Sequence, residues 1–128
     1  MPINRRVNTG LWLVQGLLGA MFVFSGVMKF VMPVEQMIAG SPIAFPGWFF
    51  HFIGVAELAG GIGLVVPWWT GIARWLTPLA AALLSVIMVG ATVVTAMGPH
   101  VGMAALPFLF LVLLEVVAVG RWRFLKET

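Results

Sequence analysis

The chain has 128 residues, of which 62% are hydrophobic and only 9% are charged, and its mean hydropathy is +1.10. This composition excludes an ordinary soluble domain, which needs far more polar surface at this length. The formal net charge is +3, and the absence of cysteine excludes disulfide exchange, thiolate metal sites and iron–sulfur clusters held by this chain alone.

Four apolar blocks, at residues 10–32, 47–66, 75–97 and 102–120, dominate the sequence. Each holds about 20 residues, which at ~1.5 Å per residue is enough for a helix to cross a hydrocarbon core ~30 Å thick. Little of the chain remains outside them. We therefore predict an all-α fold, a four-helix transmembrane bundle that forms a single membrane domain in contact with the lipid bilayer.

The first block follows Arg5 and Arg6, but it is too long for the apolar region of a signal peptide, so we expect a retained helix that ends before Pro33. A short surface helix is expected after Pro33, followed by irregular chain. Because proline lacks an N–H group, the second helix should end at Pro67, and Pro107 should kink the fourth helix or at least free a carbonyl one turn earlier.

Tryptophans and small residues indicate how the spans sit and pack. All six tryptophans lie near block ends, which predicts a belt at the two membrane surfaces. Small residues four apart predict close helix contacts. These pairs are Gly16 with Ala20 in the first block, and Ala56 with Gly60 and Ala59 with Gly63 in the second.

The basic residues fall almost entirely on one side of the predicted bundle. Six of the seven lie before the first span, between the second and third, or after the fourth, whereas segments 33–46 and 98–101 contain none. An excess of Lys and Arg marks cytoplasmic segments, so both termini are expected in the cytoplasm. The basic charge is then a topology signal, and nucleic acid is not an expected partner.

Two short motifs carry a resemblance to a known family. The stretch FSGVMK at residues 24–29 and the stretch GVAELAGG at residues 54–61 resemble the SG-x-x-K and G-x-x-E-x-x-GG elements of the DoxX-like family of small bacterial four-helix membrane proteins. Members of that family have been linked to membrane redox systems, including a thiosulfate:quinone oxidoreductase subunit and quinone-stress responses. The resemblance implies a protein of the bacterial cytoplasmic (inner) membrane, with quinone as a possible ligand.

Glu57 is the acid that most needs explanation. It lies nine residues after Trp48, or ~14 Å along a helix, which places it near the bilayer midplane. A charge at that depth costs about 2.5–3.5 kcal/mol or more, so Glu57 must be paired, solvated in a cavity or protonated. Lys29 is the natural partner. Side chains tilt toward the N-terminus of their helix, and in antiparallel spans Lys29 and Glu57 therefore lean toward each other.

Three interpretations of this pair remain open from sequence. It is a structural ion pair that fixes the first two helices, or a protonatable ligand site in an outward-opening pocket, or Lys29 instead extends to the membrane surface. In the ligand-site interpretation Ser25 and His51 are further binding candidates because they lie near Lys29 at the same end of the bundle.

Other polar residues form a second group of candidates. Glu115 near the inner end of the fourth helix is expected to reach water or pair with Arg121, and Gln15 at a similar depth can hydrogen-bond to it. His100 lies on the same side as His51, but two histidines without further ligands do not predict a metal site. Hydroxyl groups in the third helix can bond across helices or to their own preceding carbonyls; they belong to Thr92 and Thr95.

Three functions compete. The first is an accessory subunit of a membrane redox system that binds a quinone or similar small hydrophobic molecule near Lys29 and Glu57, with electrons supplied by a partner protein. The second is a non-catalytic assembly or scaffold protein in which that pair is structural. The third is a small proton-coupled transporter, which four short helices would form only as a homo-oligomer. No nucleophile or phosphate-binding motif is present, so catalysis by the chain alone is not expected.

Overall fold

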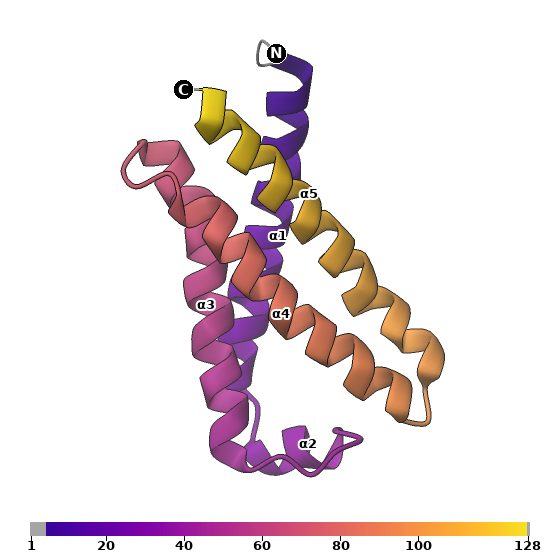
Figure 1. Ribbon diagram of the computed structural model, residues 1–128. Coiled ribbons are helices and arrows are strands. Elements are labelled where there is room, and N and C mark those ends of the chain that lie inside the picture. The colour runs from indigo at the N-terminus through magenta and orange to yellow at the C-terminus, as the bar shows by residue number, and fades with distance from the viewer. Residues whose placement is uncertain (1–4, 128) are drawn as a thin grey trace.

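A computed structural model describes residues 5–127, all of its regular structure being helical (Figure 1). Four of the helices in this part of the chain are long and apolar enough to cross a membrane. This confirms the predicted all-α bundle with four candidate spans, whereas the side on which the termini lie stays a prediction. The elements are α1 (Arg5–Val31), α2 (Val34–Ala39), α3 (Gly47–Thr70), α4 (Leu76–Met97), a short 3₁₀ helix η1 (Val101–Ala104) and α5 (Ala105–Glu127).

The long helices form two antiparallel pairs. α1 packs along α3, and α4 packs along α5, while α3 and α4 join the two pairs. The start of α1 and the end of α5 lie at one end of the bundle, and α2 lies across the opposite end (Figure 1). The α4–α5 pair slants away from α1 and α3 toward the α2 end (Figure 1). We call the two ends the termini end and the α2 end.

The core lies between these four helices, and the lipid-facing exterior is also apolar. Eight buried side chains from all four long helices form its centre, and a smaller cluster closes the termini end. The central members are Leu18, Phe22, Leu64, Ala81, Leu84, Met88, Leu114 and Val117.

Glycines allow α1 and α3 to touch along their backbones. A Cβ added at Gly26 would lie 2.7 Å from the Gly54 carbonyl oxygen, and one added at Gly19 would lie 3.1 Å from the Gly61 carbonyl oxygen. Only glycine permits such an approach of two helix backbones. The contact therefore depends on glycines seven apart on each helix, not on the predicted spacing of four.

The small-residue pairs predicted at a spacing of four do not form the contact between α1 and α3. A Cβ at Gly16 would meet nothing within 4 Å, so the predicted use of Gly16 as a contact point is wrong. Gly60 and Gly63 do lie at a close helix contact, but they face Leu84 and Ala80 of α4 rather than α1.

Pro67 does not end the second span, contrary to prediction. α3 continues through it to Thr70 and stops at Gly71, whose φ of 76° is the left-handed conformation common after helices. A proline within a helix leaves the carbonyl four residues earlier without its usual donor. Here the Thr77 hydroxyl donates to that Gly63 carbonyl at 3.1 Å, which makes the longer helix tolerable.

The α-helix of the fourth span, α5, starts and ends later than the predicted 102–120. α5 begins at Ala105 after the 3₁₀ turn, so Pro107 lies in its first turn rather than in its middle. The first four N–H groups of a helix have no partner within it, and the missing N–H of Pro107 therefore costs no helical hydrogen bond. At its other end α5 runs to Glu127, beyond the predicted limit at residue 120.

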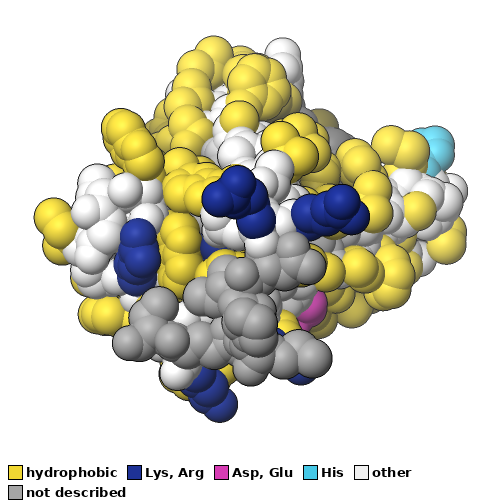
Figure 2. All heavy atoms as spheres, turned by 90° about the horizontal axis from the view of Figure 1, so that it is seen from above, with side chains coloured by type: hydrophobic (Ala, Val, Ile, Leu, Met, Phe, Trp, Pro, Cys, Tyr) yellow, Lys and Arg dark blue, Asp and Glu magenta, His cyan; other side chains and the backbone are white. Residues whose placement is uncertain are grey.

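The basic residues gather at the termini end. Figure 2 looks onto this end and shows Lys and Arg side chains spread over it among apolar ones. Trp48, Trp69, Trp75 and Trp122 are more than half exposed, as expected of a surface belt, whereas Trp68 is buried in the bundle. The prediction that all six tryptophans are surface anchors is therefore wrong for Trp68.

Candidate functional site

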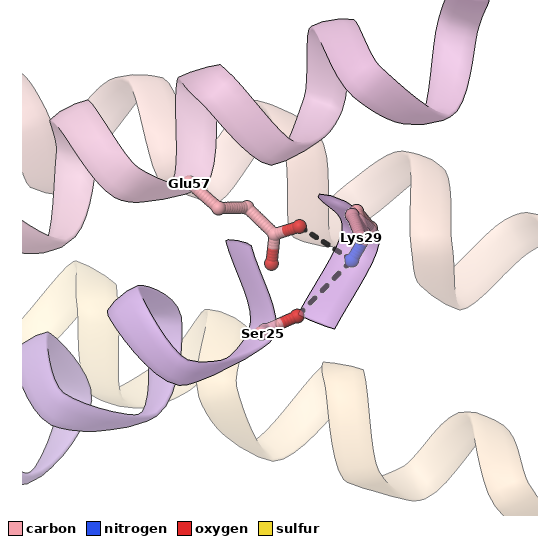
Figure 3. A network of polar contacts seen from close by, with 3 residues as sticks. All are labelled: Ser25, Lys29 and Glu57. Atoms are coloured by element: carbon pink, nitrogen blue, oxygen red, sulfur yellow. Dashed lines mark hydrogen bonds and ion pairs between the residues drawn. The ribbon is translucent and has the colours of Figure 1, made fainter. Parts of the chain in front are cut away.

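Lys29 and Glu57 meet inside the bundle. Lys29 Nζ lies 2.6 Å from Glu57 Oε1 and donates a hydrogen bond of 3.0 Å to Ser25 Oγ, one turn earlier on α1 (Figure 3). The predicted convergence of an acid and an amine from the first two spans is confirmed.

The glycine contact explains how this pair forms. Gly26 and Gly54 bring the two backbones together, and Lys29 and Glu57 each follow one of these glycines by three residues. Because the helices are antiparallel, the two charged residues lie ~9 Å apart along the bundle axis. Each side chain leans back toward its own helix N-terminus, and therefore toward the glycine contact and the other charge.

The two partners differ in burial. Only 3% of Glu57 is exposed, whereas a quarter of the Lys29 side chain is. The approach to Oε1 lies outside hydrogen-bond geometry, so this contact is an ion pair. No hydrogen bond or ion pair joins the other carboxylate oxygen to Lys29 or Ser25 (Figure 3). An ammonium has three N–H donors, and with Ser25 and Glu57 as partners one donor remains available.

A cavity of about 470 Å³ adjoins this pair. We call it the α1–α5 cavity because most of its lining comes from these two helices. Its charged and hydroxyl side chains are Lys29, Glu57 and Ser25, and the rest of the lining is apolar. The apolar residues are Ala20, Met21, Phe22 and Phe24 of α1, Met88 of α4, and Leu106, Pro107 and Phe110 of α5.

The α1–α5 cavity is open at the side of the bundle. Met21, Phe24 and Leu106 on its rim are each more than a third exposed, on the surface that faces acyl chains. A second cavity of about 570 Å³ lies toward the α2 end and shares Phe24, Ser25 and Lys29 with the first. Lys29 therefore lines both the α1–α5 cavity, which opens at the side of the bundle, and the second cavity near α2.

The histidines do not join this site. His51 stacks on Phe30, with ring centroids 5.1 Å apart, and it does not line the α1–α5 cavity. His100 is exposed in the turn between α4 and η1. Within residues 5–127, no group of three His, Asp or Glu side chains is placed to hold a metal ion.

Thr92 and Thr95, the two threonines in the later part of α4, do not connect helices. Thr92 donates to the carbonyl of Met88 on its own helix at 2.7 Å. No hydrogen bond of the Thr95 hydroxyl occurs within the described chain. The Thr92 hydroxyl therefore bonds to a preceding carbonyl of its own helix and not across to a neighbouring helix.

A second buried charge lies at the termini end and was not predicted. Arg121 is wholly buried. Its Nε donates to Gln15 Oε1 and its Nη1 to Asn8 Oδ1 at 2.9 Å. Gln15 in turn donates from Nε2 to the Leu64 carbonyl at 2.6 Å. This chain of hydrogen bonds joins α1, α3 and α5.

Aromatic rings surround the Arg121 guanidinium. Its carbon lies 4.5 Å from the ring centroid of Trp68, 5.1 Å from that of Phe124 and 5.5 Å from that of Trp12. Its Nη2 has no hydrogen-bond partner within the described residues, so the ring faces stabilise this part of the cation. The sequence signal for this site was Gln15, a polar residue inside the first apolar block, which needs a hydrogen-bond partner within the bundle.

The expected pairing of Glu115 with Arg121 and its expected hydrogen bond with Gln15 are both wrong, whereas the expectation that it reaches water is not contradicted. Gln15 bonds to Arg121 and Leu64, and Glu115 is exposed and pairs with neither Gln15 nor Arg121. The reason is helical spacing. Residues three or four apart share a helix face, and Arg121 lies six after Glu115, on a different one.

Comparison with protein families gave a match that spans the residues of this pair. The model of the DoxX-like family matches residues 13–117. The chain belongs to the DoxX-like family. Comparison with curated proteins and with solved structures gave no match.

In this DoxX-like protein the two motif elements form one structural unit. The SG-x-x-K element supplies Ser25, the contact glycine Gly26 and Lys29. The G-x-x-E element supplies Gly54 and Glu57. Each element thus pairs a glycine that lets the backbones touch with a charge one turn further on.

Proposed function

We propose that this membrane protein binds a small hydrophobic molecule with carbonyl oxygens, of the quinone class, in the α1–α5 cavity. The observation that carries the proposal is the placement of an amine and an acid in the wall of an otherwise apolar cavity open to the bilayer side. Lipid-soluble ligands reach such an entrance from within the membrane.

The dimensions and chemistry of the cavity fit this ligand class. Its volume of about 470 Å³ falls in the range of about 300–1,000 Å³ usual for small-molecule sites, which are mostly apolar with a few polar groups. A quinone offers an apolar ring with two carbonyl acceptors. The remaining N–H donor of Lys29 suits one such acceptor, and Glu57 is near enough to exchange a proton with Lys29.

We further propose that the protein acts as an accessory subunit of a redox system. Lys29 and Glu57 bind and orient a quinone and hold a proton, but neither side chain carries electrons. A partner protein then supplies the electrons, and this protein supplies the binding site in the membrane.

The proposal is tested by titrating the purified protein in lipid nanodiscs with decylubiquinone. Decylbenzene, which has a similar tail but no carbonyl groups, is the control ligand. We expect one saturable site per chain for the quinone and none for decylbenzene. A hydrogen bond to a charged group contributes about 1.5–3 kcal/mol, so Lys29→Met should weaken binding about tenfold or more.

Matched acid variants separate the site from the rest of the chain. Glu57→Gln removes the charge that holds Lys29 at the cavity, and it should also weaken binding. Glu115→Gln makes the same change outside the cavity and should leave binding intact. Absence of saturable quinone binding, or equal effects of the two variants, would contradict the proposal.

The scaffold interpretation remains the alternative because Glu57 is almost wholly buried and already paired. In that case Lys29→Met and Glu57→Gln lower stability, but no ligand binds with saturation. Proton-coupled uptake into proteoliposomes, abolished by Glu57→Gln, would instead favour the transporter.

A further inference from the structure

A separate groove runs between α4 and α5 at the termini end. Its volume is about 580 Å³, and it shares no residue with the α1–α5 cavity. We call it the α4–α5 groove. It is lined by Trp75, which precedes α4, by Pro78, Leu79 and Ala82 from α4, and by Ala118, Val119, Trp122, Arg123 and Lys126 from α5.

The spacing of these residues explains the groove. The residues at 75, 78, 79 and 82 follow an i, i+3, i+4, i+7 pattern, and those at 119, 122, 123 and 126 of α5 repeat it, so each set occupies one helix face. Small side chains at Ala82 and Ala118 leave the hollow, and larger ones border it. The lining on α5 runs over nine residues, 118–126, or ~12 Å, from the apolar part of the helix toward its charged end.

Groups typical of a membrane surface stand at the outer part of the groove. Trp75 and Trp122 are both more than half exposed, as indoles at the headgroup level are. Lys126 Nζ lies 5.7 Å from the Trp122 ring centroid. Arg123 and Lys126 are exposed, and neither forms an ion pair with another described residue.

We infer that the α4–α5 groove binds one anionic phospholipid from the leaflet next to the termini end. An acyl chain lies along Ala82 and Ala118, and the phosphate lies near Arg123 and Lys126. Charge complementarity selects this occupant over a neutral lipid, because basic pockets between spans attract anionic headgroups. A soluble anion matches the charged part of the groove alone and leaves the apolar part uncovered.

This lipid site is independent of the proposed quinone site. The two hollows lie toward opposite ends of the bundle and are lined by different residues. Failure of quinone binding leaves the lipid inference untouched, and the converse also holds.

Native mass spectrometry of the protein released from detergent micelles tests the inference. Micelles contain equal amounts of phosphatidylglycerol and phosphatidylcholine, and we expect one phosphatidylglycerol retained per chain, about tenfold in preference to phosphatidylcholine. The double variant Arg123→Gln/Lys126→Gln should abolish this preference. Arg5→Gln removes another exposed arginine at the same end that does not line the groove, and it should retain the preference.

Two further arms distinguish the groove from bare charge attraction. Ala118→Leu fills the hollow without changing charge and should reduce phosphatidylglycerol retention. Glycerol 3-phosphate, the soluble anionic headgroup, should not displace the lipid. Equal retention of the two lipids, displacement by glycerol 3-phosphate, or a loss in Arg5→Gln as large as in the double variant would overturn the inference. The exposed Arg123 and Lys126 variants need no repacking, so the test does not depend on Ala118→Leu folding.

Discussion

The contact between α1 and α3 predicts opposite effects for the same substitution at two glycines of α1. Replacing a helical glycine by alanine normally stabilises a helix by about 0.5–1 kcal/mol, because alanine loses less conformational freedom on folding. At Gly16, where a Cβ meets nothing within 4 Å, we expect this gain. Gly16→Ala is therefore the matched control.

At Gly26 the new Cβ would lie 2.7 Å from both the Gly54 carbonyl oxygen and Leu58 Cγ. The helices must separate by about 0.7 Å to reach an ordinary contact of 3.4 Å, and overpacking of this kind costs about 1–3 kcal/mol. Backbone atoms cannot rotate away as a side chain can. Because the gain from alanine is common to both sites, the two variants should differ in stability by the overpacking cost, about 1–3 kcal/mol.

Reversible unfolding in mixed micelles of dodecylmaltoside and increasing SDS measures this difference. Gly26→Ala should unfold at lower SDS than the parent protein, and Gly16→Ala at equal or higher SDS. If both variants stabilise the protein, the helices do not touch at Gly26. The explanation of how Lys29 and Glu57 meet would then be refuted.

Two other polar contacts give predictions in the same assay. Thr77→Val should destabilise the protein by about 1 kcal/mol, because the Gly63 carbonyl freed by Pro67 loses its donor. In a Pro67→Ala background the cost of Thr77→Val should fall. An unchanged cost would show that Thr77 does not compensate for Pro67. Gln15→Leu should cost about 2 kcal/mol or more, since Arg121 Nε is left buried without a partner; a neutral effect would show that the buried network contributes nothing to stability.

The ion pair between Lys29 and Glu57 could be predicted because it depends only on the residues of two neighbouring spans. A charge within an apolar block requires a partner, and the tilt of helical side chains shows which neighbour can reach it. The number and approximate position of the spans were also predictable from the sequence. The residues at which the helices begin and end were not. Those ends depend on contacts between helices, as when Thr77 compensates for Pro67 and lets α3 continue.

Arg121 shows what sequence reasoning could not reach. It lies in a basic C-terminal segment, where a topology signal is the natural interpretation. Its burial follows from the extension of α5 and from the aromatic rings that three helices bring around it. The glycine contacts were equally hidden, because fifteen glycines offer many spacings and only the crossing of α1 and α3 selects Gly26 and Gly54.

Photolabelling tests most directly whether a ligand occupies the space beside Lys29 and Glu57. The protein in nanodiscs is irradiated with an azido-quinone and the labelled peptides are identified, with excess decylubiquinone as competitor. We expect competable labels within residues 20–29 of α1 and 106–110 of α5, and their loss in Glu57→Gln. Labels spread over the lipid-facing surface, or insensitive to the competitor, would contradict the account.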